Sequence, residues 1–183
     1  MKIMFGMVAV IGILLAMILG IGHIDGLTLG EPSDETATVG TSAEREPGPA
    51  TGEEEAYLNF VIGYIVGVGN AINQVGALLE VQPEDEATWH LQMAMLLSKI
   101  RSSKDAITGV VPPPALEEFH LAGVRVLEHC STFAVLMGET IDAGEMQLSE
   151  EAKAELLLAD QVFAEVDRLL TAFLLEHPLP QPE

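Results

Sequence analysis

The hydrophobic pattern of the chain opens with an uninterrupted apolar run. The run begins at Ile3 and ends at Gly22, and it contains no charged or hydrogen-bonding side chain. As an α-helix it would be about 30 Å long, which matches the hydrocarbon thickness of a bilayer. We therefore expect residues 1–24 to form a transmembrane helix that serves as a signal anchor. Lys2 precedes the run and acidic residues follow it, so the N-terminus is expected in the cytoplasm and the remainder outside.

Cleavage of this segment is the main alternative to an anchor. The apolar core of a signal peptide usually has roughly 7–15 residues and ends in an A-x-A-like site. This run is longer, and Gly20 and Gly22 match such a site poorly. Cleavage before His23 would yield a secreted or periplasmic protein. A helix buried in the folded domain is a third interpretation of the same run.

A change in composition follows the run. Residues 25–54 are rich in Glu, Gly, Ser, Thr and Pro and have almost no large apolar residue after Leu29. Such a segment cannot bury enough apolar surface to offset the entropy of ordering it. We expect a disordered acidic linker, which as a flexible chain would span about 30 Å.

Beyond the linker, apolar residues recur at steps of three and four in four separate stretches, which is the period of one helix face. We expect an all-α fold in which residues 55–177 form an up-down-up-down antiparallel four-helix bundle, followed by a Pro-rich tail at 178–183. The four stripes are Leu58, Ile62, Ile65, Gly69, Ile72, Gly76 and Leu79; Trp89, Met93, Leu96, Ile100 and Ile107; Leu116, Gly123, Leu127, Cys130, Ala134 and Met137; and Ala152, Leu156, Ala159, Phe163, Val166, Leu170 and Phe173.

Helix-breaking residues separate the four stripes. The predicted breaks are at Pro83, at 109–114 with its three consecutive prolines, at 142–144, and after His177. Ser149 is a suitable N-cap for the last helix, because acidic residues follow it directly.

The first bundle helix carries four internal glycines, at Gly63, Gly67, Gly69 and Gly76. Each costs about 0.5–1 kcal/mol relative to alanine, so we expect a compensating role in close helix packing. Gly63 and Gly67 also form a G-x-x-x-G pair, which favours a homodimer as an alternative. A small-ligand groove is the third interpretation.

The same helix has no charged residue from Tyr57 to Leu79, so a second membrane span is an alternative. Its asparagines oppose that interpretation, because they are costly in hydrocarbon. The stripe it shares with the other three helices also favours a place in the bundle.

Histidines and acidic residues are the candidate metal ligands. Glu117 and His120 form an E-x-x-H, and Glu86 and His90 are four residues apart. Di-metal bundles need such a pair on two helices and further glutamates on the others, and here the E-x-x-H occurs once. We therefore expect no metal site and no cofactor, and we interpret His120 as a hydrogen-bonded, half-buried residue of the bundle.

Composition narrows the function classes further. The chain of 183 residues has 28 acidic and 8 basic residues, a formal net charge of −20. This charge opposes binding to nucleic acids, whose phosphates require Lys and Arg, and it disfavours anionic lipid head groups. The single cysteine, Cys130, allows no intramolecular disulfide.

No nucleophile elbow, phosphate-binding loop or paired carboxylates indicate an enzyme. We expect a non-enzymatic binding or scaffold module, anchored in the membrane and acting on a protein partner outside the cytoplasm. The alternative is a sensor-type bundle that binds a small ligand or a metal ion.

Overall fold

The computed structural model describes residues 48–80 and 85–179. The predicted anchor from Ile3 to Gly22, most of the predicted linker and the last residues of the tail lie outside these ranges. The described residues form four α-helices and no strand, which confirms the predicted all-helical fold. The helices are α2 (Gly52–Glu80), α3 (Glu86–Thr108), α4 (Glu117–Asp142) and α5 (Glu150–Glu176), and a short 3₁₀ turn, η1 (Pro114–Leu116), precedes α4.

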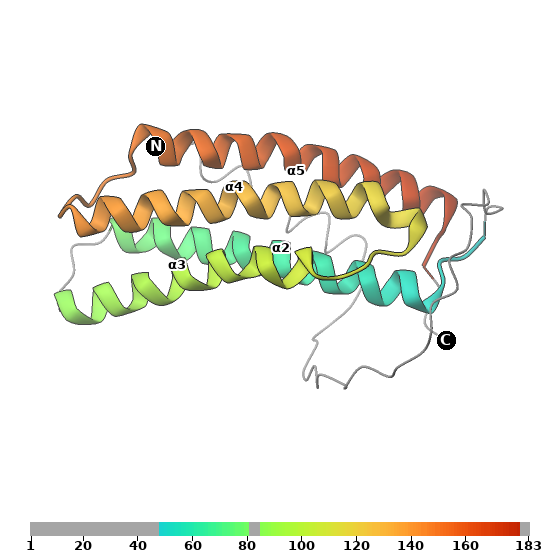
Figure 1. Cartoon of the computed structure of the whole chain (residues 1–183), viewed down its shortest axis with the longest axis horizontal. Helices are drawn as coiled ribbons and strands as arrows, with labels where there is room; N and C mark the ends of the chain where they lie inside the picture. Colours follow the sequence, from blue (N-terminus) through green and yellow to red (C-terminus); the bar gives the residue numbers. More distant parts are fainter. Residues whose placement is uncertain (1–47, 81–84, 180–183) are drawn as a thin grey trace.

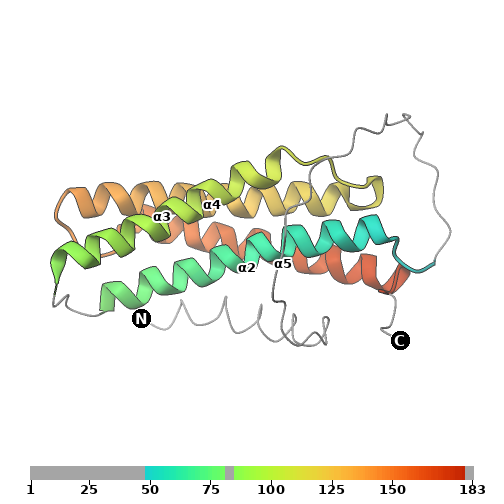
Figure 2. The ribbon, with the colours of Figure 1, turned by 90° about the horizontal axis from the view of Figure 1, so that it is seen from below.

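The helices lie side by side in two layers. Figure 1 shows α4 and α5 above α2 and α3, and Figure 2 shows α2 and α3 in front when the molecule is seen from below. Successive helices run in opposite directions, so α2 and α4 start at the same end of the molecule. α4 is the central helix, because it packs against each of the other three.

Local capping explains where the helices begin. α2 starts at Gly52, inside the range that we expected to be linker, because Thr51 and Glu54 form a capping box. The Thr51 hydroxyl accepts from the Glu54 backbone N–H at 3.2 Å, and the Glu54 carboxylate accepts from the Thr51 backbone N–H at 2.7 Å. Ser149 caps α5 as predicted, and its hydroxyl accepts from the Ala152 N–H at 3.1 Å.

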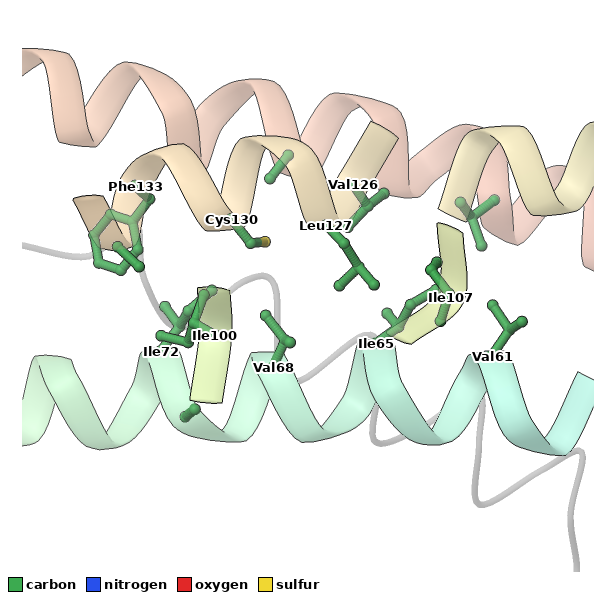
Figure 3. Close-up of a cluster of buried hydrophobic side chains, with 14 of the residues drawn as sticks. Val61, Ile65, Val68, Ile72, Ile100, Ile107, Val126, Leu127, Cys130 and Phe133 are labelled. Atoms are coloured by element: carbon green, nitrogen blue, oxygen red, sulfur yellow. The ribbon is translucent and has the colours of Figure 1, made fainter. Parts of the chain in front are cut away.

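The core is a continuous apolar cluster between the two layers. Figure 3 shows side chains from α2, α3 and α4 pointing toward one another. Most of the predicted stripe residues are buried there. α2 also buries a second stripe that the periodicity did not single out, because α2 packs against both α3 and α4. The members of this second stripe are Val61, Val68, Ala71 and Val75.

The ends of the domain are joined by hydrogen bonds. The Ala50 N–H donates to the Pro178 carbonyl at 3.2 Å. His177 donates through Nδ1 to the Gly48 carbonyl at 2.9 Å. The segment before α2 is therefore fixed to the segment after α5.

α2 is also the one helix of the described residues that is long and apolar enough to cross a membrane. In the structure it contributes ten buried residues to the domain. This role favours a core helix over the second membrane span that we considered at Tyr57 to Leu79.

Candidate functional site

The candidate metal ligands lie apart. Glu117 is exposed in the first turn of α4, whereas His120 is 8% exposed on the same helix. His90 is exposed on α3, with Nε2 3.8 Å from a carboxylate oxygen of Glu86. Within residues 48–80 and 85–179, no group of three or more His, Cys, Asp or Glu side chains is placed to hold a metal ion.

His120 is instead half of a buried polar pair. The hydroxyl of Tyr57, in the second turn of α2, lies 2.5 Å from His120 Nδ1. Burial raises the pKa of Tyr57 to about 12 and lowers the pKa of His120. Both groups are therefore neutral near pH 7, and the hydrogen bond between them ties α2 to α4.

A second histidine links α4 to α5. His129 Nδ1 donates to a carboxylate oxygen of Glu155 at 2.7 Å, and both side chains are partly exposed. This contact and the Tyr57–His120 pair each use two groups from different helices, so we interpret both as packing contacts.

The glycines of α2 have different surroundings. Gly63 is exposed and a Cβ there would meet no atom within 4 Å, whereas a Cβ on Gly67 would be 4.0 Å from Lys99 Cε. Gly69 is buried and Gly76 is half-buried.

The closest approach recorded at a glycine is at Gly123 of α4, which is a predicted stripe residue. A Cβ there would lie 3.4 Å from Val61 Cγ1 and 3.7 Å from Ile65 Cδ1. Gly123 therefore lets α2 and α4 approach closely.

A groove between α3 and α4 is the candidate binding site. Its volume is about 550 Å³, and small residues on both helices, Ala94 and Ser98 on α3 and Ala134 and Gly138 on α4, leave it open. A Cβ on Gly138 would meet no atom within 4 Å. Met93 forms part of its apolar lining.

Charged side chains of both signs line the same groove. α3 contributes Arg101, and α4 contributes Glu139 and Asp142. None of the three forms an ion pair with another side chain of the described ranges. The groove thus combines an apolar lining with charges that are available to a ligand. Sequence analysis did not find the groove, because it depends on which residues of α3 and α4 lie opposite each other, and facing residues such as Ala94 and Gly138 are 44 positions apart in the chain.

Comparisons with known proteins assign neither a family nor a function to this chain. No protein family, no curated protein and no solved structure matches this chain.

Proposed function

We propose that this chain is a membrane-anchored four-helix bundle that acts outside the cytoplasm as a non-enzymatic binding or scaffold module. The observation that carries this proposal is the α3–α4 groove. Its volume lies in the range of ligand-binding clefts, and its lining combines apolar residues with His90, Ser98 and three charged side chains.

The chemistry of the groove favours a protein partner. Arg101 lies on one wall and Glu139 and Asp142 lie on the other, so a segment with one acidic and one basic side chain would find complementary charges. Val135, which is 40% exposed, and the exposed Ala94 provide apolar surface in the same groove. A helix or extended segment with an apolar ridge fits this arrangement.

Site-specific crosslinking in cells that make the protein would test the groove. A photoreactive amino acid replaces Ser98, which lines the groove, or Gln161, which is exposed on α5. We expect one discrete crosslinked protein from position 98, lost when Gly138→Leu fills the groove, and no such product from position 161. The same product from both positions, or none from position 98, would contradict the proposal.

Extraction of membranes at alkaline pH would test the anchor. An integral membrane protein stays in the pellet, and the full chain is expected there. Replacing Leu14 and Leu15 with aspartate should release it, since a carboxylate in the middle of a membrane span is costly. Release of the unaltered chain would contradict the anchored form.

A further inference from the structure

The negative charge of the domain is divided unequally between its two layers. α4 carries five acidic residues and one basic residue, and α5 carries seven acidic and two basic residues. α3 carries two acidic and three basic residues, and α2 has no charged residue from Ala56 to Leu79. Among the four helices, α4 and α5 together carry 12 acidic and 3 basic residues, whereas α2 and α3 carry 6 acidic and 3 basic residues, a difference that composition alone does not reveal.

The outward side of α2 is uncharged along most of its length. The helix is apolar enough in length and composition to cross a membrane, yet 39% of its most apolar stretch is buried. Its other large apolar residues, among them Phe60, Ile62 and Tyr64, are partly buried against the core. Its exposed positions between the two charged ends are Ala56, Asn59, Gly63, Asn70, Gln74 and Ala77.

A row of side chains on α3 borders this surface. Leu91 and Met95 are 63% and 65% exposed, and Lys99 follows at the same spacing of four residues, so the three lie along one side of the helix. A Cβ on Gly67 of α2 would be 4.0 Å from Lys99 Cε, which places the Lys99 end of the row beside α2. Figure 2 shows α2 and α3 next to each other on this side of the molecule.

Lys99 forms no ion pair with the other described residues. A free lysine beside exposed apolar side chains is typical of surfaces that rest on a bilayer. The apolar groups enter the boundary of the acyl chains, and the ammonium reaches the phosphates. We call the exposed α2 positions given above, together with Leu91, Met95 and Lys99, the α2–α3 outer face.

We propose that the α2–α3 outer face lies on the surface of the phospholipid bilayer in which the chain is anchored. This inference rests on the proposed function, because the anchor supplies the bilayer. The orientation follows from charge, since lipid phosphates repel the acidic α4–α5 layer and attract Lys99. Arg101 and the acidic groups of the groove are not part of this face.

The contact does not need high intrinsic affinity. One lysine near an anionic surface contributes about 1 kcal/mol. The predicted linker, however, holds the domain close to the membrane at an effective concentration in the millimolar range. A face that would bind free vesicles poorly can therefore be occupied when the chain is anchored.

Spin labels on the full chain in phosphatidylcholine–phosphatidylglycerol liposomes would test this orientation. The label is attached to Met95→Cys on α3 or to Gln161→Cys on α5, with Leu91→Cys as a second site on the face. Cys130 is buried and can stay in place. Power saturation then compares collisions with oxygen, which is concentrated in lipid, and with a water-soluble nickel complex.

We expect a several-fold higher oxygen-to-nickel ratio at positions 91 and 95 than at position 161. Lys99→Glu should lower the ratio at position 95 toward that at position 161. Similar ratios at all three positions in a chain that resists alkaline extraction would overturn this inference and leave the anchor intact. Spin–spin broadening at position 95 with a low oxygen ratio would identify a second copy as the occupant instead. Release of the chain by alkali would overturn the anchor and this inference together.

Discussion

Tyr57 and His120 share a buried hydrogen bond of 2.5 Å between the hydroxyl and Nδ1, and this bond joins α2 to α4. The two side chains are 7% and 8% exposed, so neither has ready access to water as a substitute partner. Removing one member of such a pair leaves the other unsatisfied, which costs more than the bond itself contributes.

Tyr57→Phe is therefore expected to lower the free energy of unfolding by about 1–2 kcal/mol. Denaturation in urea, followed by circular dichroism, would measure the change. Tyr64→Phe is the matched control, because Tyr64 is half-buried and packs on Phe60 with ring centroids 5.0 Å apart. That variant should stay within about 0.5 kcal/mol of the parent. Equal losses of unfolding free energy in the two variants would show that the hydrogen bond of the Tyr57 hydroxyl does not stabilise the fold.

The same pair predicts how stability depends on pH. Burial lowers the pKa of His120 below its ordinary value of 6.5, so the folded protein binds this proton less readily than the unfolded chain. The contribution of neutral His120 is complete above pH 6.5 and is lost as the pH falls toward the lower pKa of the folded state. The loss of stability caused by His120→Leu should therefore be largest near pH 7.5 and shrink near pH 5. A loss that is constant across this interval would refute the assignment.

The close packing at Gly123 limits the size of the side chain that can fit between α2 and α4. Gly123→Leu places a branched side chain where a Cβ would already lie 3.4 Å from Val61 Cγ1, and we expect a loss of about 1–3 kcal/mol in unfolding free energy. Gly63→Leu serves as the control, because the space around Gly63 is open. Thermal denaturation should separate the two variants clearly. If Gly63→Leu were the more damaging change, the recorded packing of α2 would be wrong.

The N-cap of α5 can be tested with two substitutions, one that removes the hydrogen-bond acceptor and one that replaces it. Ser149→Ala removes the acceptor for the Ala152 N–H and should cost about 1 kcal/mol. Ser149→Asp keeps an acceptor at the same position and should restore most of that loss, since a negative charge also suits a helix N-terminus. Chemical denaturation of the three proteins would measure this order, and failure of the aspartate to rescue would argue against capping.

The thiol of Cys130 should be unreactive in the folded protein. It is fully buried on α4, and burial raises the pKa of its thiol to about 12, so almost no thiolate forms near neutral pH. A disulfide reagent such as Ellman's should react with the native chain many times more slowly than with the chain in urea. Ser102→Cys provides an exposed thiol on α3 for comparison. Rapid modification of native wild-type protein would indicate that α4 is less well packed than described.

The sequence was sufficient to predict the helices because their signals are local. The three prolines before Leu116 and the serine before Glu150 act within one turn, and α4 and α5 begin where these residues predict. The stripe through Leu127, Cys130 and Ala134 is also buried as expected.

What could not be predicted depends on contacts between distant segments. Tyr57 and His120 are 63 residues apart, and no local pattern pairs them. The α3–α4 groove arises because Ala94 and Gly138, on different helices, are both small at one level of the domain. The division of charge between the layers likewise requires knowing which helices are neighbours. Net charge is a property of the whole chain and does not show how the charges are distributed among the helices.

The two ends of the domain lie next to each other. They are joined by hydrogen bonds between Gly48 and His177 and between Ala50 and Pro178. A domain whose ends meet can be inserted into a surface loop of another protein, because closing that loop costs little entropy. The same geometry suits a circular permutation in which a short peptide joins the ends and new termini open between α3 and α4. The order of the helices along the chain is thus separable from their arrangement in space.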